Sequence, residues 1–415
     1  VLNIFFDQPD KGLFINELIR KTGLYPNSVQ RSLLTLSEQG ILTRKKGLKF
    51  TYYSLNHKYP YYSELQNIIK KSPLDSNPHR VWTKILNRVS SYPFTEALYR
   101  SNIDNLKQTY GVGVNNLWYN SITYGVYYLQ ESLVALGKAI SNKIDKDISF
   151  AKLDIKNCKL ACDNLVASSK DFPALDFPAM TDRILSQKIY DFYDLYLKVF
   201  PYVTTPHAIE RYFGDKIKQE LSDQKYYDIL ISPTDMIDDE QEAALNLASY
   251  VKKYGRNKNY RKALHKHYLN YCWMPLWSIH ADPLPETYFE SEIDNISEKV
   301  KDPQKEIIKL KAAQTNKKKA LEKALNKIKA SGSLTEHVRL IQEYVTLRVY
   351  RKNAICKANY YQLPLLYESG NRLGLSDEDV KLLSYPEIMD GLNGKVTKTS
   401  LEKLVKKRKS GWAIL

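Results

Sequence analysis

One stretch of the chain, from Phe14 to Asn56, changes its hydrophobic spacing twice, and this limits its fold more than any other feature. Phe14, Leu18 and Ile19 fall on one face of a predicted helix. The glycine and proline of the next segment, GLYP, end that helix and begin a second one at a new angle. The stretch therefore predicts two helices joined by a turn.

The second of these helices has one apolar face and one polar face. Val29, Leu33 and Leu36 follow at i, i+4 and i+7, so they must face a core. The polar residues are then left on the outside, and their types are those that bond base edges and phosphates. These candidate DNA-binding residues are Asn27, Ser28, Gln30, Arg31 and Thr35.

After Gly40 the chain switches to residues typical of strands. Two segments, Ile41–Lys46 and Phe50–Leu55, are joined by a tight turn with the sequence KGLK, which predicts a β-hairpin. The hairpin is rich in basic residues, which we expect to hold phosphates. These residues are Arg44, Lys45, Lys46 and Lys49.

In order, the first helix, GLYPNSVQRSLLTLSEQGIL, the basic hairpin, YYSLN and PYYSELQNIIKKS resemble a winged-helix transcription-regulator domain, of the type found upstream of small nucleotidyltransferases. The resemblance covers Val1 to about Ser72. It implies binding to double-stranded DNA, with the second helix in the major groove and the hairpin, or wing, against the backbone. One departure is Tyr25, which stands where a Ser or Thr usually caps the recognition helix. The alternative is a winged helix that docks protein.

The chain has 415 residues and a net charge of +16, with a pI near 9.3. This length predicts two or three domains, and the charge favours polyanionic partners. AT-biased coding would also enrich lysine, so the distribution of charge says more than its sum. Residues 1–72 carry 11 basic side chains against 5 acidic ones, which fits a small DNA-binding module.

The four cysteines are too few and too scattered for a disulfide framework, which predicts a reducing interior. The sequence shows neither a secretory signal nor a run of the roughly 18 apolar residues that a membrane span requires. We therefore expect a soluble, cytoplasmic protein.

Beyond the winged helix, the chain has few strand signals. SPLDSNP predicts a linker at residues 73–79, followed by a helical domain at residues 80–295. Within it we expect helices at Val81–Tyr99, interrupted at Pro93, and at Leu117–Ile140. The acidic cluster of Asp238, Asp239 and Glu240 is expected to begin a further helix rather than to bind metal.

Residues 296–415 predict a helical hairpin, a short C-terminal helical module and a basic tail. Lys305–Ala330 forms the first arm, with Leu321, Leu325 and Ile328 on one face, and SGS reverses the chain into the second. The fold is thus predicted to be mainly α: a winged helix of three helices plus a β-hairpin, then a large all-helical domain that contains a long helical hairpin.

Over His265–Gly411, the segments HYLNYCWMPLWSIHADPLPETYFESEIDNI, the hairpin, VTLRVYRKNAICKANYYQLPLLYESGNRLGLSDEDVKLLSYPEIMDGLNG and KKRKSG are similar to the helical connector of phosphoenolpyruvate synthase-like, PEP-utilising enzymes. The resemblance implies an ATP-binding domain and a phosphohistidine domain elsewhere, and neither is visible in this sequence. No catalytic residue can therefore be carried over. Arg348, Arg351 and Lys352 match a basic helix of that region, and their simplest interpretation is a solvated face.

The remaining chemical motifs have structural explanations, so we predict no catalytic residue, metal site or cofactor. Three histidines and a cysteine cluster, but two of them lie two apart on a helix and cannot face one ion. That cluster consists of His265, His267, His280 and Cys272.

Three smaller motifs remain. The pair Cys158 and Cys162 suits a buried helix face. The carboxylate pair Asp145 and Asp147 lacks the Gly-Ser turn of a nucleotidyltransferase, and the Gly-x-Gly of Gly111 and Gly113 lacks a preceding strand.

Together these observations predict a DNA-binding, transcription-regulator-like protein with a helical domain that binds a ligand, a partner or a second copy of the chain. One alternative is a fragment or degenerate member of the PEP-utilising phosphotransferase group that lacks its ATP-binding and phosphohistidine domains. Another is a protein-interaction scaffold. The Lys-rich helical hairpin could also touch a DNA backbone, or could simply be solvated.

Overall fold

The computed structural model describes residues 2–22, 26–47, 51–60, 62–63, 66, 82–86, 91–120, 124–221, 223–234 and 239–414. The linker predicted at residues 73–79 lies outside these ranges. The chain divides into two compact units. Unit 1 comprises Val1–Trp82 with Ser121–Thr123, and unit 2 comprises Thr83–Asn120 with Tyr124–Leu415.

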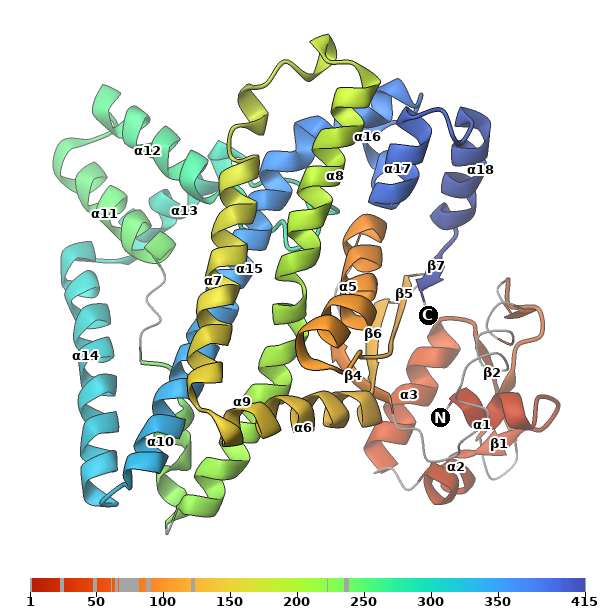
Figure 1. Ribbon diagram of the computed structural model, residues 1–415, viewed down its shortest axis with the longest axis horizontal. Coiled ribbons are helices and arrows are strands. Elements are labelled where there is room, and N and C mark those ends of the chain that lie inside the picture. Colours follow the sequence, from red (N-terminus) through yellow and green to blue (C-terminus); the bar gives the residue numbers. More distant parts are fainter. Residues whose placement is uncertain are drawn as a thin grey trace. The chain divides into compact units, whose positions relative to one another are not determined.

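Unit 1 contains short helices and a small sheet (Figure 1). Its strands form an antiparallel sheet in the order β1-β3-β2, in which Leu42 lies opposite Leu55 and Lys46 lies opposite Thr51. The elements of unit 1 are α1 (Leu2–Asp7), β1 (Leu13–Phe14), α2 (Ile15–Thr22), α3 (Pro26–Glu38), β2 (Leu42–Lys46) and β3 (Thr51–Leu55).

A small apolar core holds these elements together. Phe5 of α1, Leu18 of α2 and Leu33 of α3 are fully buried, and they meet Tyr53 and Leu55 of the sheet. Burying each such side chain stabilises the fold by about 2 kcal/mol. The core therefore fixes α3 against the sheet that carries the hairpin.

Unit 2 is mainly helical, as the sequence predicts (Figure 1). Its elements are β4 (Trp82–Leu86), α5 (Tyr92–Tyr110), β5 (Asn116–Asn120), β6 (Tyr124–Leu129), α6 (Gln130–Lys146), α7 (Ser149–Ser169), the 3-10 turns η2 (Phe172–Ala174) and η3 (Phe177–Ala179), α8 (Asp182–Val199), α9 (Pro201–Glu220), η4 (Gln224–Tyr226), α10 (Tyr227–Ile231), α11 (Asp239–Tyr254), α12 (Lys258–Tyr271), α13 (Glu286–Lys299), α14 (Pro303–Lys327), α15 (Gly332–Arg372), α16 (Asp377–Val380), α17 (Tyr385–Leu392), α18 (Lys398–Lys409) and β7 (Trp412–Ile414).

The longest described helix, α15, has 41 residues and runs through the middle of unit 2. It packs against α7 on one side and α9 on another, and Figure 1 shows α15 (blue) beside α7 (yellow). Its buried residues recur along its whole length, from Leu334 to Gly370. Unit 2 is therefore organised along this helix.

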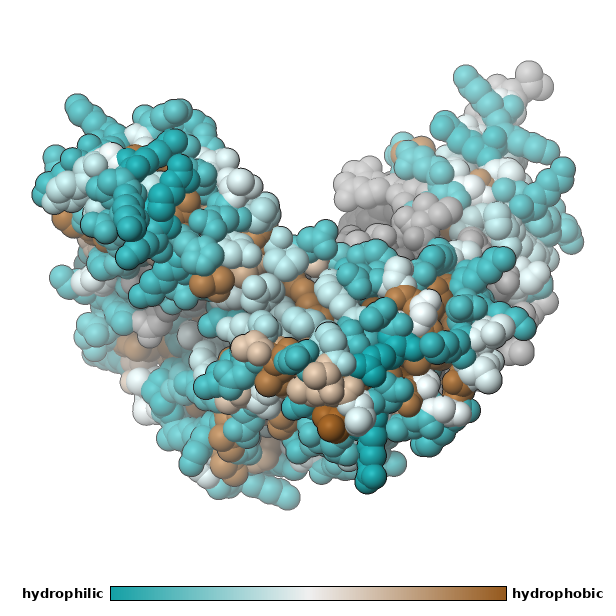
Figure 2. Space-filling view, turned by 90° about the horizontal axis from the view of Figure 1, so that it is seen from above, coloured by the Kyte–Doolittle hydropathy of each residue, from teal (hydrophilic) through white to brown (hydrophobic). Residues whose placement is uncertain are grey.

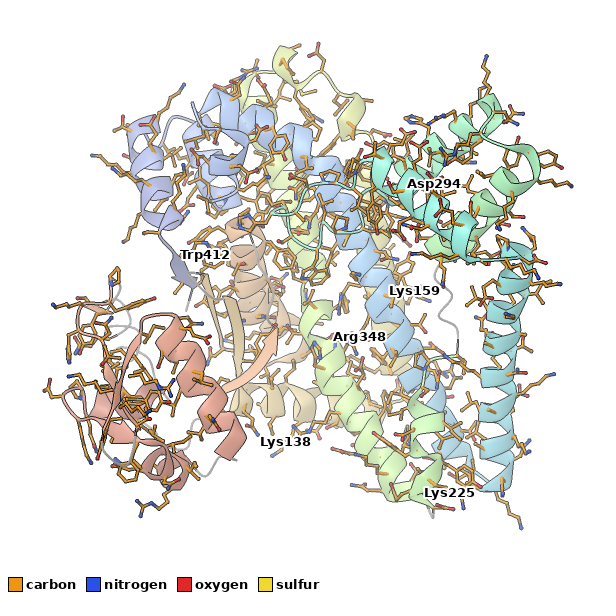
Figure 3. All side chains as sticks on the ribbon, turned by 180° about the vertical axis from the view of Figure 1, so that it is seen from behind. Lys138, Lys159, Lys225, Asp294, Arg348 and Trp412 are labelled. Carbon is orange, nitrogen blue, oxygen red and sulfur yellow. The ribbon has the colours of Figure 1, made fainter. Side chains whose placement is uncertain are left out.

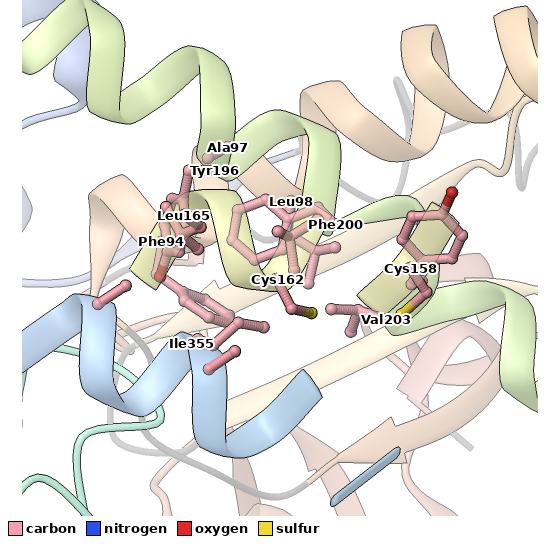
Figure 4. Close-up of a cluster of buried hydrophobic side chains, with 14 of the residues drawn as sticks. Phe94, Ala97, Leu98, Cys158, Cys162, Leu165, Tyr196, Phe200, Val203 and Ile355 are labelled. Carbon is pink, nitrogen blue, oxygen red and sulfur yellow. The ribbon is translucent and has the colours of Figure 1, made fainter. Parts of the chain in front are cut away.

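The core around α15 combines residues from helices that are far apart in the sequence (Figure 4). Phe94 of α5, Leu165 of α7, Tyr196 of α8 and Ile355 of α15 are buried together. Phe94 also meets Phe200 edge-on, with ring centroids 5.1 Å apart. This core contains residues from both sides of the domain boundary that the sequence predicts between residues 295 and 296, such as Ile279 and Ala324.

Buried polar contacts fix the register between the helices. The Tyr196 hydroxyl donates to the side-chain carbonyl of Asn359 at 2.7 Å. The Asn359 amide in turn donates to the backbone carbonyls of Leu276 and Trp277 at 2.8 and 3.1 Å. A one-residue shift of α15 would leave these buried groups without partners, which is costly in an apolar interior.

The prediction of an all-helical second domain is wrong for several segments. Strands β5 (Asn116–Asn120) and β6 (Tyr124–Leu129) pair antiparallel, and the helix expected over Leu117–Ile140 begins only at Gln130. The segment is rich in Tyr, Trp and Val, which suit a sheet. It joins a four-stranded sheet in the order β4-β6-β5-β7, so the predicted helix at Val81–Tyr99 is also replaced in part by a strand.

Pro93 starts α5 rather than interrupting a helix. The first turn of a helix has N–H groups without partners inside the helix, so a proline is tolerated there. By contrast, α11 begins at Asp239 with Glu240 and Glu242 in its first turn, and the predicted acidic helix start is confirmed. Asp238 lies outside the described residues.

A carboxyl group is buried between three helices of unit 2. Asp154 of α7 is 3% exposed and accepts hydrogen bonds from the hydroxyls of Tyr110 and Tyr344, at 2.5 and 3.0 Å. Burial raises the pKa of Asp154 to about 6, although both hydroxyls and the nearby Lys143 act in the opposite direction. Charging this group therefore destabilises the folded state.

We expect this cost to appear as a pH dependence of stability. Because the folded pKa of Asp154 lies above its ordinary value of 3.8, the folded state holds the proton more tightly than the unfolded state between about pH 4 and pH 6. The contribution of this raised pKa to the free energy of unfolding is present in full at low pH and is lost as the pH rises through 6. Asp154→Asn removes the ionisation, so the free energy of unfolding of the variant minus that of the wild type should rise by about 2 kcal/mol from pH 4 to pH 7. Chemical denaturation across that range measures the difference, and a difference that does not change with pH would contradict the assignment.

Candidate nucleic-acid interface

The apolar face of α3 is buried as the sequence predicts. Val29 and Leu33 are fully buried, and Leu36 packs half-buried against the same core. The residues that follow Val29 and Leu33, which are Gln30 and Leu34, are exposed. The helix therefore turns one side to the core and leaves the other accessible.

The polar face of α3 is described for one of its predicted residues. Gln30 is exposed, as expected. The side chains of Asn27, Ser28, Arg31 and Thr35 lie outside the described part of the chain, and so does Tyr25 at the expected cap position. Their roles remain predictions.

Strand β2 places three cationic side chains at its end. Arg44, Lys45 and Lys46 are all exposed, opposite Tyr53, Tyr52 and Thr51 of β3, respectively. Side chains alternate along a strand, so Arg44 and Lys46 continue the face of the buried Leu42 beyond the core, and Lys45 lies on the other face. Both faces of the hairpin are therefore positive. Lys49 lies outside the described residues.

The charge of these three residues is not neutralised within the described part of the chain, where none has an acidic group within 4 Å. Two other lysines of unit 1 behave differently. Lys11 and Lys21 both pair with Glu17, at 2.9 and 3.4 Å, and the hydrogen bond from Lys11 is the main cause that lowers the pKa of Glu17. The three hairpin cations thus lie next to one another without an acidic partner among the described residues, whereas Lys11 and Lys21 share Glu17.

A compact set of hydrogen bonds ties the hairpin to the end of α3. Gly40 takes a left-handed conformation (φ 72°), and the next residue, Ile41, donates its N–H to the carbonyl of Leu36 at 3.0 Å. The side-chain amide of Asn56 donates to the carbonyl of Gly40 at 2.7 Å, which closes the base of the hairpin. The sequence alone did not single out Asn56, because its contact forms only when β3 returns past α3.

The other clusters considered from the sequence do not form a common site. His265 pairs with Glu286 at 2.9 Å, whereas His267 is buried and pairs with Glu240 at 3.0 Å. Among the described residues, no group of three or more His, Cys, Asp or Glu side chains could hold a metal ion.

The carboxylate pair and the two glycines have separate structural roles. Asp145 accepts from the Tyr212 hydroxyl at 2.5 Å, and Asp147 accepts from the backbone N–H of Ser149 at 2.9 Å. Gly111 ends α5 at φ 82°. Gly113 lies so close to the carbonyl of Ile103 that a Cβ atom there would be only 2.7 Å away. These contacts explain the residues without phosphate binding.

The prediction of a buried cysteine pair is confirmed, whereas the prediction of a solvated basic face on α15 is wrong for one residue. Cys158 and Cys162 are fully buried, as predicted. The expectation of a solvated face is wrong for Arg351, which is buried and donates to the backbone carbonyl of Tyr202, while burial lowers its pKa to about 10. Arg348, labelled in Figure 3, pairs with Glu210 of α9 at 3.0 Å. Arg348 and Arg351 therefore lie about one turn apart on α15, but Arg351 is buried inside unit 2 and Arg348 lies at its surface.

None of the helices in the described ranges is long and apolar enough to cross a membrane. Hydrophilic residues cover most of the face seen in Figure 2.

In the comparisons with known proteins, no family model matches the chain, and no curated protein is significantly similar to it. The function is therefore argued from the chain itself.

Gly40 provides a test of how the hairpin is held. A side chain at φ 72° is strained even though a Cβ atom added at Gly40 would meet no atom within 4 Å beyond its chain neighbours, so Gly40→Ala should destabilise unit 1 by about 1 kcal/mol. Hydrogen exchange of the α3 and β3 amides should then become about 5-fold faster. Gly12→Ala is the matched control, because its Cβ would meet Tyr52 at an ordinary 3.7 Å. Equal exchange rates in the two variants would argue against the left-handed anchor.

Proposed function

We propose that unit 1 is a winged helix that binds double-stranded DNA, with α3 in the major groove and the β2–β3 hairpin against the phosphate backbone. The protein would then be a DNA-binding regulator. The observation that carries this proposal is the exposed group of Arg44, Lys45 and Lys46, which lacks acidic neighbours among the described residues.

The arrangement of unit 1 supports the proposal. The element order α1-β1-α2-α3-β2-β3 and the sheet order β1-β3-β2 suit a helix-turn-helix followed by a wing. The major groove is about 12 Å wide and admits a helix. Because Val29 and Leu33 anchor one side of α3 in the core, its other side is available to enter the groove.

The hairpin and α3 would contribute differently to DNA binding. The hairpin cations would displace counterions from phosphates, which gives affinity that depends on salt and little on sequence. Gln30, together with the predicted Asn27, Ser28, Arg31 and Thr35, would provide sequence readout from α3. Unit 2 would bind the ligand, the protein partner or the second copy of the chain that controls occupancy of the DNA.

A double substitution in the hairpin tests the backbone contact. In Lys45→Ala/Lys46→Ala, the slope of log K against log salt concentration should become shallower by roughly two, because two phosphate contacts are lost. Affinity should fall to a similar extent for all duplexes. Fluorescence anisotropy titrations of the full chain with a labelled duplex, at several salt concentrations, measure both quantities.

The matched control for the hairpin variant is Lys11→Ala/Lys21→Ala. It removes the same number of charges from unit 1, but these two lysines are already paired with Glu17. We expect its salt slope to remain near that of the wild type. An equal loss of slope in both double variants would indicate only a dependence on net charge, and would overturn the hairpin assignment.

Gln30 tests whether α3 reads bases. A glutamine that bonds an adenine in two places contributes about 1–3 kcal/mol of discrimination. Gln30→Ala should therefore relax the preference at one base position by roughly 5- to 100-fold, and should leave the salt slope unchanged. Competition between duplexes that differ at single positions provides the measurement, with Asn16→Ala on α2 as the control. A Gln30→Ala variant with the same preferences as the wild type would place base reading elsewhere.

A further inference from the structure

Helix α14 is unusually exposed to solvent for a helix of unit 2. Its buried residues are Pro303, Ile307 and Ala324, which lie near its two ends. Between residues 308 and 320, every residue is exposed except Leu310 and Gln314, which are half-buried. The helix packs mainly against α10 and α11, and Figure 3 shows its side chains projecting from the edge of unit 2.

The charge of α14 is strongly one-sided. The helix contains eight lysines and two glutamates. At about 100° per residue, five of the lysines fall within roughly 80° of arc, on the side opposite the half-buried Leu321, Leu325 and Ile328. We name these five lysines the α14 basic face: Lys305, Lys309, Lys319, Lys323 and Lys327.

The positive charge is open mainly towards the C-terminal half of this face. Lys309 pairs with Glu306 at 3.0 Å, and Lys305 lies 3.6 Å from Asp302, so acidic neighbours offset the first part. In the part of the chain that the structure describes, Lys319 and Lys323 have no acidic group within 4 Å. They are one turn apart, and each repels the other.

The lysines of the α14 basic face do not stabilise unit 2. Like charges one turn apart on a helix destabilise it, and the middle of α14 gains almost no burial in return. The helix keeps its form through residues of high helix propensity, such as alanine, lysine, glutamine and leucine. A helix of this kind is suited to present charge to a polyanion.

We propose that the α14 basic face is a second contact with the phosphate backbone of duplex DNA. This inference rests on the proposed function in one respect, namely that the ligand is DNA. The face extends over about 33 Å from Lys305 to Lys327, which is close to the length of one turn of B-DNA, about 34 Å. Its arc holds Asn316 and no glutamine or arginine, and we expect its lysines to contact phosphates rather than bases, so the contact should depend little on sequence.

The test uses the full chain and a labelled duplex of arbitrary sequence. In Lys319→Ala/Lys323→Ala, the slope of log K against log salt concentration should become shallower by roughly two, with sequence preference unchanged. Lys319→Arg/Lys323→Arg should keep the wild-type slope, because the charge is retained. The matched control is Lys156→Ala/Lys159→Ala on α7, where two exposed lysines also lie one turn apart, and its slope should not change.

Comparison with the hairpin variant separates this inference from the proposed function. If the hairpin variant changes the slope and the α14 variant does not, the α14 contact is overturned and the winged-helix proposal stands. If only the α14 variant changes it, the α14 contact stands and the hairpin assignment fails. An α14 variant that keeps full DNA binding but loses an acidic protein partner would overturn DNA as the occupant.

Discussion

Helix α15 holds unit 2 together, because other helices of the unit pack against it along most of its length. Burial of each large apolar side chain contributes about 2 kcal/mol. A helix of 41 residues with buried positions from Leu334 to Gly370 therefore depends on its neighbours for most of its stability. Long partners are therefore needed, and α7 and α9 supply them. Once these helices lie along α15, polar contacts such as that between Tyr196 and Asn359 fix their register. The interior of unit 2 is thus explained by packing.

Function is better sought where the fold leaves charge without compensation. In unit 1, Lys11 and Lys21 share the carboxylate of Glu17, whereas the three hairpin cations have no acidic partner among the described residues. In unit 2, α14 repeats the pattern, since its first lysines have acidic neighbours and Lys319 and Lys323 have none among the described residues. Polyanions such as DNA gain most from surfaces of this kind, because each open cation can release a counterion.

The sequence predicted those features that depend on local spacing. The buried side of α3, the exposed Gln30 and the mainly helical character follow from helical periodicity, which neighbouring residues determine. The hairpin β5–β6 was missed because its tyrosines and leucines also fit a helix, and its pairing with β7 joins residues almost 300 positions apart. The partners of Asp154 and the closure by Asn56 were missed for the same reason, since tertiary contacts create them.

A hydrogen-exchange footprint on bound DNA would show whether α3 and the β2–β3 hairpin form a DNA-binding surface. The full chain would be compared with and without a saturating duplex, selected beforehand from a random pool, and the amide exchange of each segment followed over time. We expect slower exchange in α3 and in the hairpin, with the amides of α12 and α17 unchanged. Unchanged exchange throughout unit 1, under conditions where the duplex is bound, would contradict it.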